Sequence, residues 1–345
     1  GPSHRFDMRY EVDLIEEVAR IHGYDSIPET TLSAQSPLEA VTESTIDMER
    51  AAATLIARDY QEVVTYSFID ADANTRFTGI ESPLVLSNPI SSDLSVMRAS
   101  LWPGMVAAAS ANMARQQDRV RIFEASRSYH GTLDAHYEVV RLAGLVTGPI
   151  VPEQWGTQAQ SVDFTDLQAD IEAILALTGD TENIRFEVAE HPALQPGQAA
   201  RILRGDVEIG VAGKLHPGIA KDYDLKRAVF LFELDASKAL ESAAPEAKVI
   251  SRFPAIRRDI AVVVDDKVSA EELVTAVSSS APELIQDVRI FDIYRGDRIE
   301  AGRKSVAIGL ILQETSRTLT DDDADTVMAA AVAKLEDKFA AELRD

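Results

Sequence analysis

The stretch from Leu84 to Tyr129 reads LVLSNPISSDLSVMRASLWPGMVAAASANMARQQDRVRIFEASRSY and contains the signals that decide the fold. A short apolar run ends at the turn residues Ser87-Asn88-Pro89. A helix is expected from about Leu101, because Pro103 suits a first turn, where its missing N–H costs nothing. From Val120 to Arg127 the side chains alternate with the period of two expected of a strand. Strand, closely packed helix and long strand together predict the middle of an antiparallel sheet backed by helices.

Strand-like and helix-like runs continue on both sides of this stretch. Further strands are expected at 62–68, 137–146, 184–188, 199–204, 207–215 and 228–234, and helices at 44–58 and 164–177. Asp70 is a suitable N-cap for an additional short helix. About seven strands with helices between them predict an α+β domain from about 38 to 247.

The pattern changes after an alanine-rich, charged segment at 237–249, where we place a domain boundary. Strands are expected at 259–264, 288–294 and 306–312, and a helix at 270–277. Ser269 is the natural N-cap of that helix. A last helix is expected after Thr320, because three aspartates in its first turn complement the helix dipole. With the final residues as a possible fourth edge strand, this order predicts a ferredoxin-like β-α-β-β-α unit over 252–345.

Composition limits the classes of function. The chain has 345 residues, no cysteine and a net charge of −23, with no apolar run of transmembrane length and no leader. The absence of cysteine excludes disulfides and thiolate metal sites. The other features favour a cytoplasmic protein that contacts neither membrane nor DNA. Such acidity also argues against general nucleic-acid binding, so any RNA contact must come from a local basic patch. The chain opens Gly1-Pro2-Ser3-His4 without an initiator Met, which suggests a piece of a longer protein.

The first 30 residues predict a short amphipathic helix with an acidic face. Apolar residues recur at helical spacing between Val12 and Ile21, and Gly23 follows as a C-terminal stop. Four carboxylates lie on this helix or just before it: Asp7, Asp13, Glu16 and Glu17. Converging carboxylates without a thiol or imidazole suit a hard cation such as Mg²⁺ or Ca²⁺. The alternative is that Arg20 pairs with Glu16 and that the acidic face is simply solvated.

No catalytic residue is predicted in this chain. The sequence contains no G-x-x-x-x-G-K-[ST], G-x-G-x-x-G or G-x-S-x-G motif. Its six histidines are scattered, and His191 and His216 each precede a proline, as loop residues do. A lone histidine without a partner is usually structural.

Three blocks of the sequence resemble, in order, the β subunit of bacterial phenylalanyl-tRNA synthetase. SNPISSDLSVMRASLWPGM (87–105) and RIFEASRSY (121–129) resemble its synthetase-like core. RFD (5–7) and EVDLIEEVARIHGYDSIP (11–28) are similar to the end of the helical domain before that core. The segment from SRFPAIRRDIAVVVDD (251–266) to KFAAELRD (338–345) is similar to the anticodon-binding domain that ends these subunits.

The resemblance implies a class II synthetase-like core that has lost its active site. Active class II synthetases carry an Arg-x-Glu pair on a motif strand and a later G-x-G-x-x-Arg. Here the strand has Arg121 and Glu124, three residues apart, and such residues do not share a face. Near the end of the domain, Gly210 and Gly213 have the wrong spacing, and no Arg follows where one is needed. The resemblance therefore implies that ATP binds to the catalytic α subunit and that this chain alone is inactive.

The resemblance also implies partners and sites. The chain is expected to join α in an α2β2 heterotetramer, to contact the tRNA for phenylalanine, and to have no editing activity. Asp7, Asp13, Glu16 and Glu17 match the acidic residues that help hold a Mg²⁺ shared with α, a site expected to be weak or empty without α. The helix at 101–115, rich in small residues, and the strand with Pro89 are candidates for subunit packing, although ordinary core packing explains each equally well.

In the C-terminal unit, the resemblance implies that the sheet face binds the anticodon side of the tRNA. Aromatic rings there stack on bases while arginines hold phosphates. The residues predicted to contact tRNA are Arg252, Phe253, Arg257, Arg258, Tyr294, Arg295, Arg303 and Lys304, with Arg298 in the same basic turn region. The alternative is that Phe253 packs in the core and that the arginines pair with Asp259, Asp265 and Asp292.

Two other functions remain open from the sequence. One is a stand-alone RNA-binding protein that uses the ferredoxin-like unit. The other is an active hydrolase or ligase that uses the acidic cluster with a metal; mutation of Glu16 and Glu17 together should then abolish its turnover.

Overall fold

The structure is a computed structural model that describes residues 2–31, 33, 44–181, 183–242, 250–296 and 299–344. The chain divides into two compact units, Gly1–Ala244 and Pro245–Asp345. Most of the predicted boundary segment, 243–249, lies outside the described residues. Among the described residues, no helix has the length and apolarity needed to cross a bilayer.

The first unit is built on a seven-stranded sheet. Its strands in spatial order are β1 (Gln61–Glu62), β4 (Val120–Thr132), β5 (Ala135–Thr147), β9 (Val229–Asp235), β8 (Val207–Leu215), β7 (Leu194–Arg204) and β6 (Ile184–Val188). The short β1 runs parallel to β4, and all other neighbours are antiparallel. The predicted antiparallel core is therefore confirmed, and its long strands β4 and β5 pair in register along their whole length.

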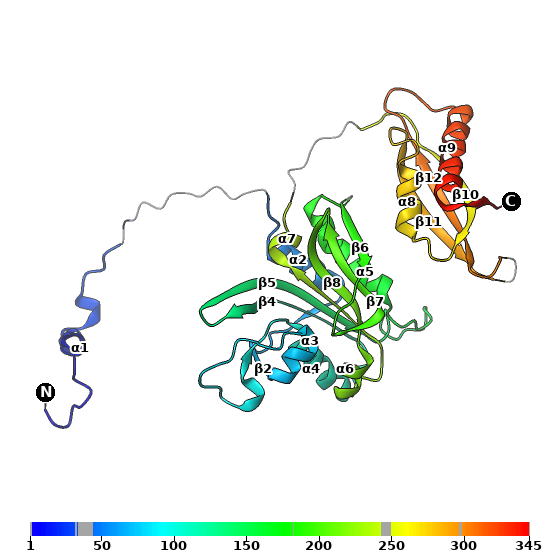
Figure 1. Ribbon diagram of the computed structural model, residues 1–345. Coiled ribbons are helices and arrows are strands. Elements are labelled where there is room, and N and C mark those ends of the chain that lie inside the picture. Colours follow the sequence, from blue (N-terminus) through cyan, green and yellow to red (C-terminus); the bar gives the residue numbers. More distant parts are fainter. Residues whose placement is uncertain are drawn as a thin grey trace. The chain divides into compact units, whose positions relative to one another are not determined.

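Helices cover both faces of this sheet (Figure 1). One face carries α2 (Met48–Ala57), α5 (Phe164–Leu175) and α7 (Ala236–Ala239), and the other α3 (Ala71–Thr78), α4 (Trp102–Ala114) and α6 (Pro217–Asp222). Phe123 and Phe232 are buried on the first face, and Trp102 and Leu145 on the second. Because both faces are covered, any charged side chain on a central strand must find its partner inside the protein.

Local signals place several helix ends where they were predicted. Asp70 caps α3 by accepting a hydrogen bond from Ala73 N at 3.0 Å. Pro103 lies in the first turn of α4. The large side chains of α4 point into the core, and a Cβ on Gly104 would lie 2.3 Å from Thr65 Oγ1. Gly104 therefore serves close packing within the unit, whereas Ala107 and Ala111 are exposed.

The predicted strand at 62–68 is wrong in its middle. Only Gln61–Glu62 and β2 (Phe68–Ile69) are strands, and β2 pairs with β3 (Val96–Met97). Between them the Thr65 N–H and hydroxyl donate to Glu124, at 3.3 and 2.7 Å. Hydrogen bonds to a side chain thus replace the backbone hydrogen bonds of a strand at this position. The apolar run 84–86 likewise forms only one isolated bridge, from Val85 to Val96.

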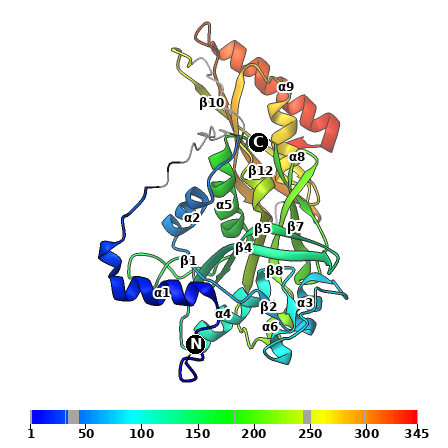
Figure 2. The same ribbon diagram turned by 90° about the vertical axis from the view of Figure 1, so that its left-hand side faces the viewer.

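The second unit contains a four-stranded sheet in the order β11-β12-β10-β13. The strands are β10 (Ile256–Asp265), β11 (Ile285–Tyr294), β12 (Arg303–Leu312) and β13 (Glu342–Leu343), and the helices are α8 (Ala270–Ser278) and α9 (Asp321–Phe339). Both helices pack on one face (Figure 2). Ser269 and Thr320 begin them with capping boxes. The predicted fourth edge strand is confirmed by β13, which pairs with β10.

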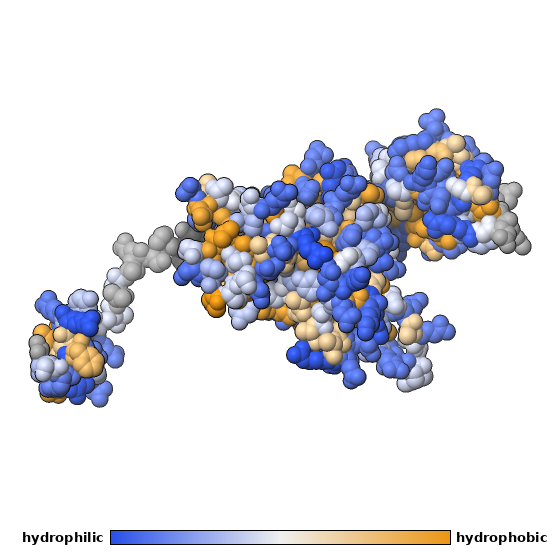
Figure 3. All heavy atoms as spheres, turned by 60° about the horizontal axis from the view of Figure 1, so that its bottom comes forward, coloured by the Kyte–Doolittle hydropathy of each residue, from blue (hydrophilic) through white to orange (hydrophobic). Residues whose placement is uncertain are grey.

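The N-terminal segment contains α1 (Glu11–His22) and a short 3₁₀ turn (Tyr24–Ser26), neither with a buried residue. The predicted helix is confirmed, and Gly23 ends it with a φ of 92°, in the region that favours glycine. Figure 3 shows hydrophobic side chains among the hydrophilic ones of this segment. Its exposed large apolar and aromatic residues are Phe6, Tyr10, Val12, Leu14, Ile15, Val18 and Ile21.

Candidate functional site

The two polar residues that would mark a synthetase active site point to opposite faces of the large sheet. Arg121 forms an ion pair with Asp170 of α5, and its guanidinium lies 4.7 Å from the ring centre of Tyr60. Glu124 instead accepts from Arg98 Nη1 at 2.9 Å on the other face. The predicted separation of this pair is confirmed, so the two side chains do not hold one ligand between them.

Asp170 is the centre of a buried polar group on the α5 face. Besides Arg121, it accepts from Arg58 Nε at 2.5 Å and from the Tyr60 hydroxyl at 2.7 Å. Burial, followed by the neighbouring Asp170 charge, raises the pKa of Tyr60 well above its usual value. These contacts join α2, α5 and the strands β1 and β4, which gives Arg121 a structural role.

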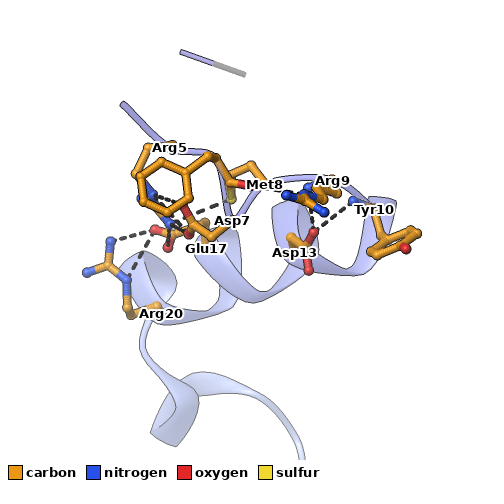
Figure 4. Close-up of polar contacts among 9 residues, drawn as sticks. Arg5, Asp7, Met8, Arg9, Tyr10, Asp13, Glu17 and Arg20 are labelled. Atoms are coloured by element: carbon orange, nitrogen blue, oxygen red, sulfur yellow. Dashed lines mark hydrogen bonds and ion pairs between the residues drawn. The ribbon is translucent and has the colours of Figure 1, made fainter. Parts of the chain in front are cut away.

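Two of the four N-terminal carboxylates, Asp7 and Glu17, are held by arginines (Figure 4). Arg5 Nη2 lies 2.7 Å from both Asp7 Oδ2 and Glu17 Oε1, and Arg20 Nη2 lies 2.6 Å from Glu17 Oε2. Hydrogen bonds from Arg5 lower the pKa of Asp7 and are the main cause of the lowered pKa of Glu17. A guanidinium thus stands where a cation bridging these carboxylates would lie.

The other two predicted metal ligands do not complete a cation site. One oxygen of Asp13 accepts from the backbone N–H groups of Arg9 and Tyr10, both at 2.7 Å, and so caps α1. Glu16 is exposed, and Arg20 pairs with Glu17 rather than with it. Among the residues that the structure describes, no three His, Asp or Glu side chains are grouped to hold a metal. The arrangement therefore does not fit a Mg²⁺ site formed by this chain alone.

The four-stranded sheet presents one face that the helices leave open. On it, Arg257 pairs with Asp259 at 2.8 Å and also lies 5.3 Å from the ring centre of Phe291. A Cβ on Gly309 would lie 3.0 Å from Asp259 Oδ1, so glycine lets this pair lie flat on the sheet. Phe291 is 52% exposed. The result is a platform of accessible rings beside arginines.

A second ring on this face also has a cationic neighbour. Tyr294 is 37% exposed, and the Arg344 guanidinium lies 5.2 Å from its ring centre. Arg344 follows β13, and its backbone N–H donates to Ala261 O on β10. Since β11 and β13 are the two edges of the sheet, the Arg344 side chain extends across the open face.

The other basic residues predicted to contact tRNA are placed differently. Arg258 pairs with Asp321, Arg295 with Asp266 and Arg303 with Glu342. Lys304 is buried, and its ammonium donates to Asp266 O at 2.9 Å, so in this arrangement it is not available to a phosphate. The strand register turns Lys304 toward the helix-covered side, an orientation that composition alone could not indicate.

The start of the unit holds two further predicted contacts. Arg252 is exposed, and Phe253 is half-buried with its carbonyl accepting from Gln313 Nε2 at 2.7 Å. Arg298 lies outside the described residues. The sequence reasoning missed Phe291; its signal was a large aromatic residue within a strand that otherwise alternates apolar and charged residues.

An apolar edge is exposed on the first unit. Beyond β1, at one edge of the seven-stranded sheet, Val64 and Tyr66 are 89% and 74% exposed, and Ile90 is 87% exposed in the loop after the predicted strand with Pro89. Val64 and Tyr66 are two residues apart, and neighbouring exposed apolar side chains are typical of protein–protein contacts.

Comparison with known proteins agrees with this organisation. A family described as "Phenylalanyl tRNA synthetase beta chain CLM domain" matches residues 27–236. A "Ferredoxin-fold anticodon binding domain" matches residues 251–344, and a "tRNA synthetase B5 domain" matches residues 1–24. The three matched families follow one another along the chain.

Curated relatives match the chain along its whole length. The phenylalanine–tRNA ligase beta subunit of Methylococcus capsulatus is 46% identical and covers 100% of this chain, which spans 43% of that protein. The corresponding subunit of Pseudomonas syringae pv. tomato is 44% identical over 99% of this chain and 43% of that protein. The chain thus spans less than half the length of these relatives.

Among solved structures, the pyrrolysyl-tRNA synthetase of Desulfitobacterium hafniense aligns over 56% of this chain and 64% of that chain, at 16% identity and a TM-score of 0.43. This overlap is too low to support an argument. The family matched over residues 27–236, more than half of the sequence, is decisive. The chain belongs to the family of phenylalanyl-tRNA synthetase beta chains.

Proposed function

We propose that the chain is the C-terminal portion of a phenylalanine–tRNA ligase β subunit and acts as the non-catalytic partner in the ATP-dependent attachment of phenylalanine to its tRNA. The observation that carries this proposal is the succession of three matched families over one chain. The opposite orientation of Arg121 and Glu124 supports the non-catalytic role, because both are committed to internal ion pairs.

The catalytic partner in this proposal is an α subunit in an α2β2 assembly, which binds ATP and acts in the cytoplasm. The exposed side chains of Val64 and Tyr66, which follow the edge strand β1, support such a contact, because burying them removes apolar area from water. A Mg²⁺ shared between the subunits remains a prediction, since Arg5 must first leave Asp7 and Glu17.

The tRNA contact in this proposal is the open face of the four-stranded sheet. Phe291 and Tyr294 supply rings on which bases can stack, and Arg257 and Arg344 lie beside these rings. The surface ion pairs of the face can exchange their carboxylate partners for phosphates at little cost, because exposed pairs contribute little to stability.

Co-expression with a cognate α subunit tests the proposal. We expect the chain to co-purify with α, and phenylalanyl-adenylate to form only in samples that contain α. A double substitution of Val64 and Tyr66 by serine should weaken the association, whereas Val188→Ser, at another exposed valine, should not. Amino-acid activation by the chain alone would contradict the proposal. RNA binding without any association with α would favour a stand-alone RNA-binding module.

A further inference from the structure

A cavity of about 710 Å³ opens beside the seven-stranded sheet, on the face that carries α3 and α4. Strands β5, β8 and β9 contribute Arg141, Glu208 and Glu233, and α3 and the segment before α4 contribute Thr78 and Ser100. The volume lies in the range of small-molecule sites. All lining residues belong to the first unit. Neither the tRNA contact nor the α-subunit contact proposed above uses this cavity.

Glu233 is the buried anionic group of the cavity. Its Oε1 accepts from Ser100 Oγ at 3.0 Å and from Leu101 N at 2.8 Å, which fixes the carboxylate in one orientation. The other oxygen, Oε2, lies 3.9 Å from Arg141 Nε, beyond hydrogen-bond distance. Burial raises the pKa of Glu233, which means that the neighbouring groups only partly offset the cost of a buried negative charge.

Arg141 is the cationic group beside it. Its Nε donates to Ser128 Oγ at 3.2 Å, and Ser128 Oγ also contacts His130 Nε2 at 2.8 Å. Among the described residues, the two terminal nitrogens of Arg141 have no hydrogen-bond acceptor. A guanidinium with both terminal nitrogens free matches the two oxygens of a carboxylate. His130 adds no charge near neutral pH, because burial and then Arg141 lower its pKa.

The remaining charges of the lining exclude a polyanion. Three cations, Arg141, Arg201 and Lys238, face four carboxylates, Glu190, Glu208, Glu233 and Asp235. Lys238 is paired with Asp235 at 3.3 Å, and Arg201 with Glu187 at 2.7 Å. A nucleoside triphosphate would be repelled, because its phosphates and the excess carboxylates have the same sign of charge. A ligand with one negative and one positive group would not.

We propose that this cavity binds a small zwitterion in which a carboxylate and an ammonium group are separated by one carbon, the chemistry of a free α-amino acid. Arg141 receives the carboxylate, and Glu233 Oε2 accepts hydrogen bonds from the ammonium group. The short separation of the two protein groups matches the short separation of the two ligand charges. The open part of the cavity holds the ligand's side chain.

Ligand-detected NMR on the 345-residue chain, without α subunit, tests this proposal. The probes are glycine, L-alanine, L-leucine and L-phenylalanine, each up to about 10 mM, well above the Kd that two charge-assisted contacts should give. Each is paired with its N-acetyl derivative, which lacks the ammonium charge, and its amide, which lacks the carboxylate. We expect at least one free amino acid to bind and both derivatives to bind at least about tenfold more weakly.

Three variants connect binding to the cavity. Arg141→Gln and Glu233→Gln should each weaken amino-acid binding at least about tenfold, while Arg141→Lys should retain part of it. Arg127→Gln is the matched control. Arg127 points to the face of the sheet opposite to Arg141, and it pairs with exposed Glu138. The fluorescence of buried Trp102 reports whether each variant is folded.

Three results would overturn the proposal. They are the absence of binding by all four amino acids, equal binding of the N-acetyl derivatives or of inorganic phosphate, and binding that survives Arg141→Gln and Glu233→Gln in folded protein. The second result would indicate a plain anion site. None of them bears on association with α, so the failure of this inference is distinguishable from failure of the proposed function.

Discussion

Glu124, on β4 of the seven-stranded sheet, forms an ion pair with Arg98 in which both side chains are only 2% exposed, whereas Arg257 and Asp259 on the four-stranded sheet are 56% and 49% exposed. The larger sheet has helices on both faces, and the smaller sheet has them on one. The Arg98–Glu124 pair is therefore committed to the fold, because removal of one partner leaves the other buried and unpaired. The Arg257–Asp259 pair on the open face remains free to change partners.

This difference separates two kinds of charged and aromatic groups within one chain. Arg121, Glu124 and Asp170 have the residue types of an active site, but each forms an ion pair inside the protein. Arg257 and Phe291 have the same kinds of internal contact, but at a surface. Four predictions examine this contrast.

The largest effect is expected for Glu124→Ala. Because Arg98 is then buried without a counter-charge, the free energy of unfolding of the first unit should fall by about 3–5 kcal/mol. Urea unfolding followed by tryptophan fluorescence measures this unit alone, since both tryptophans, Trp102 and Trp155, lie within it. Asp287→Ala, which breaks the exposed Arg289 pair, is the matched change in the other unit and should cost about 0–1 kcal/mol by circular dichroism. Similar losses in both would refute the contrast.

A smaller loss is expected for Asp170→Asn. The carboxylate accepts from Arg58, Tyr60 and Arg121, but Arg58 is partly exposed and can turn to water. We expect the first unit to lose about 2–3 kcal/mol, the range for hydrogen bonds to charged groups. Glu172→Gln, on the exposed side of the same helix, serves as the control and should change stability little. An unaffected Asp170→Asn protein would show that this cluster does not hold α5 to the sheet.

On the open face, Phe291→Ala should reduce affinity rather than stability. Loss of one base–aromatic stack should weaken binding of a transcript of the tRNA for phenylalanine by about 1–3 kcal/mol, measured by fluorescence anisotropy. Arg257→Ala should also lower the salt dependence of binding by about one counterion. Arg317 precedes α9 and forms an ion pair with Asp323 in its first turn. Arg317→Ala is the control and should change neither the affinity nor its salt dependence. Equal effects of all three substitutions would argue for nonspecific attraction.

The smallest effect is a pH dependence from Glu233. Its pKa is raised in the folded state, so the native protein binds more protons than the unfolded chain at pH values between the two pKa values. The contribution of Glu233 to the free energy of unfolding is therefore fully present below the ordinary pKa of 4.5 and is lost as pH rises through the folded value. The slope can reach at most about 1.4 kcal/mol per pH unit. Glu233→Gln should remove it, while Glu190→Gln, at an exposed carboxylate, should not. Parallel curves for the wild type and Glu233→Gln would show that burial does not perturb this group.

Much of the architecture could be predicted from the sequence because the signals are local. The capping boxes at Ser269 and Thr320, the position of Pro103 in α4 and the stop at Gly23 each depend on bonds or torsions within a few residues. The period of two along β4 likewise determined that Arg121 and Glu124 point to opposite faces, because successive strand residues must alternate.

Only the tertiary structure decided which groups meet. Glu17 pairs with Arg5 as well as with Arg20, and Thr65 interrupts a predicted strand by binding Glu124 from 59 positions away. Phe291 is accessible on the open face, and Arg141 lies beside Glu233 in a cavity. These outcomes depend on strand order and on which faces the helices cover. Such contacts join distant parts of the chain, so no local pattern in the sequence contains them.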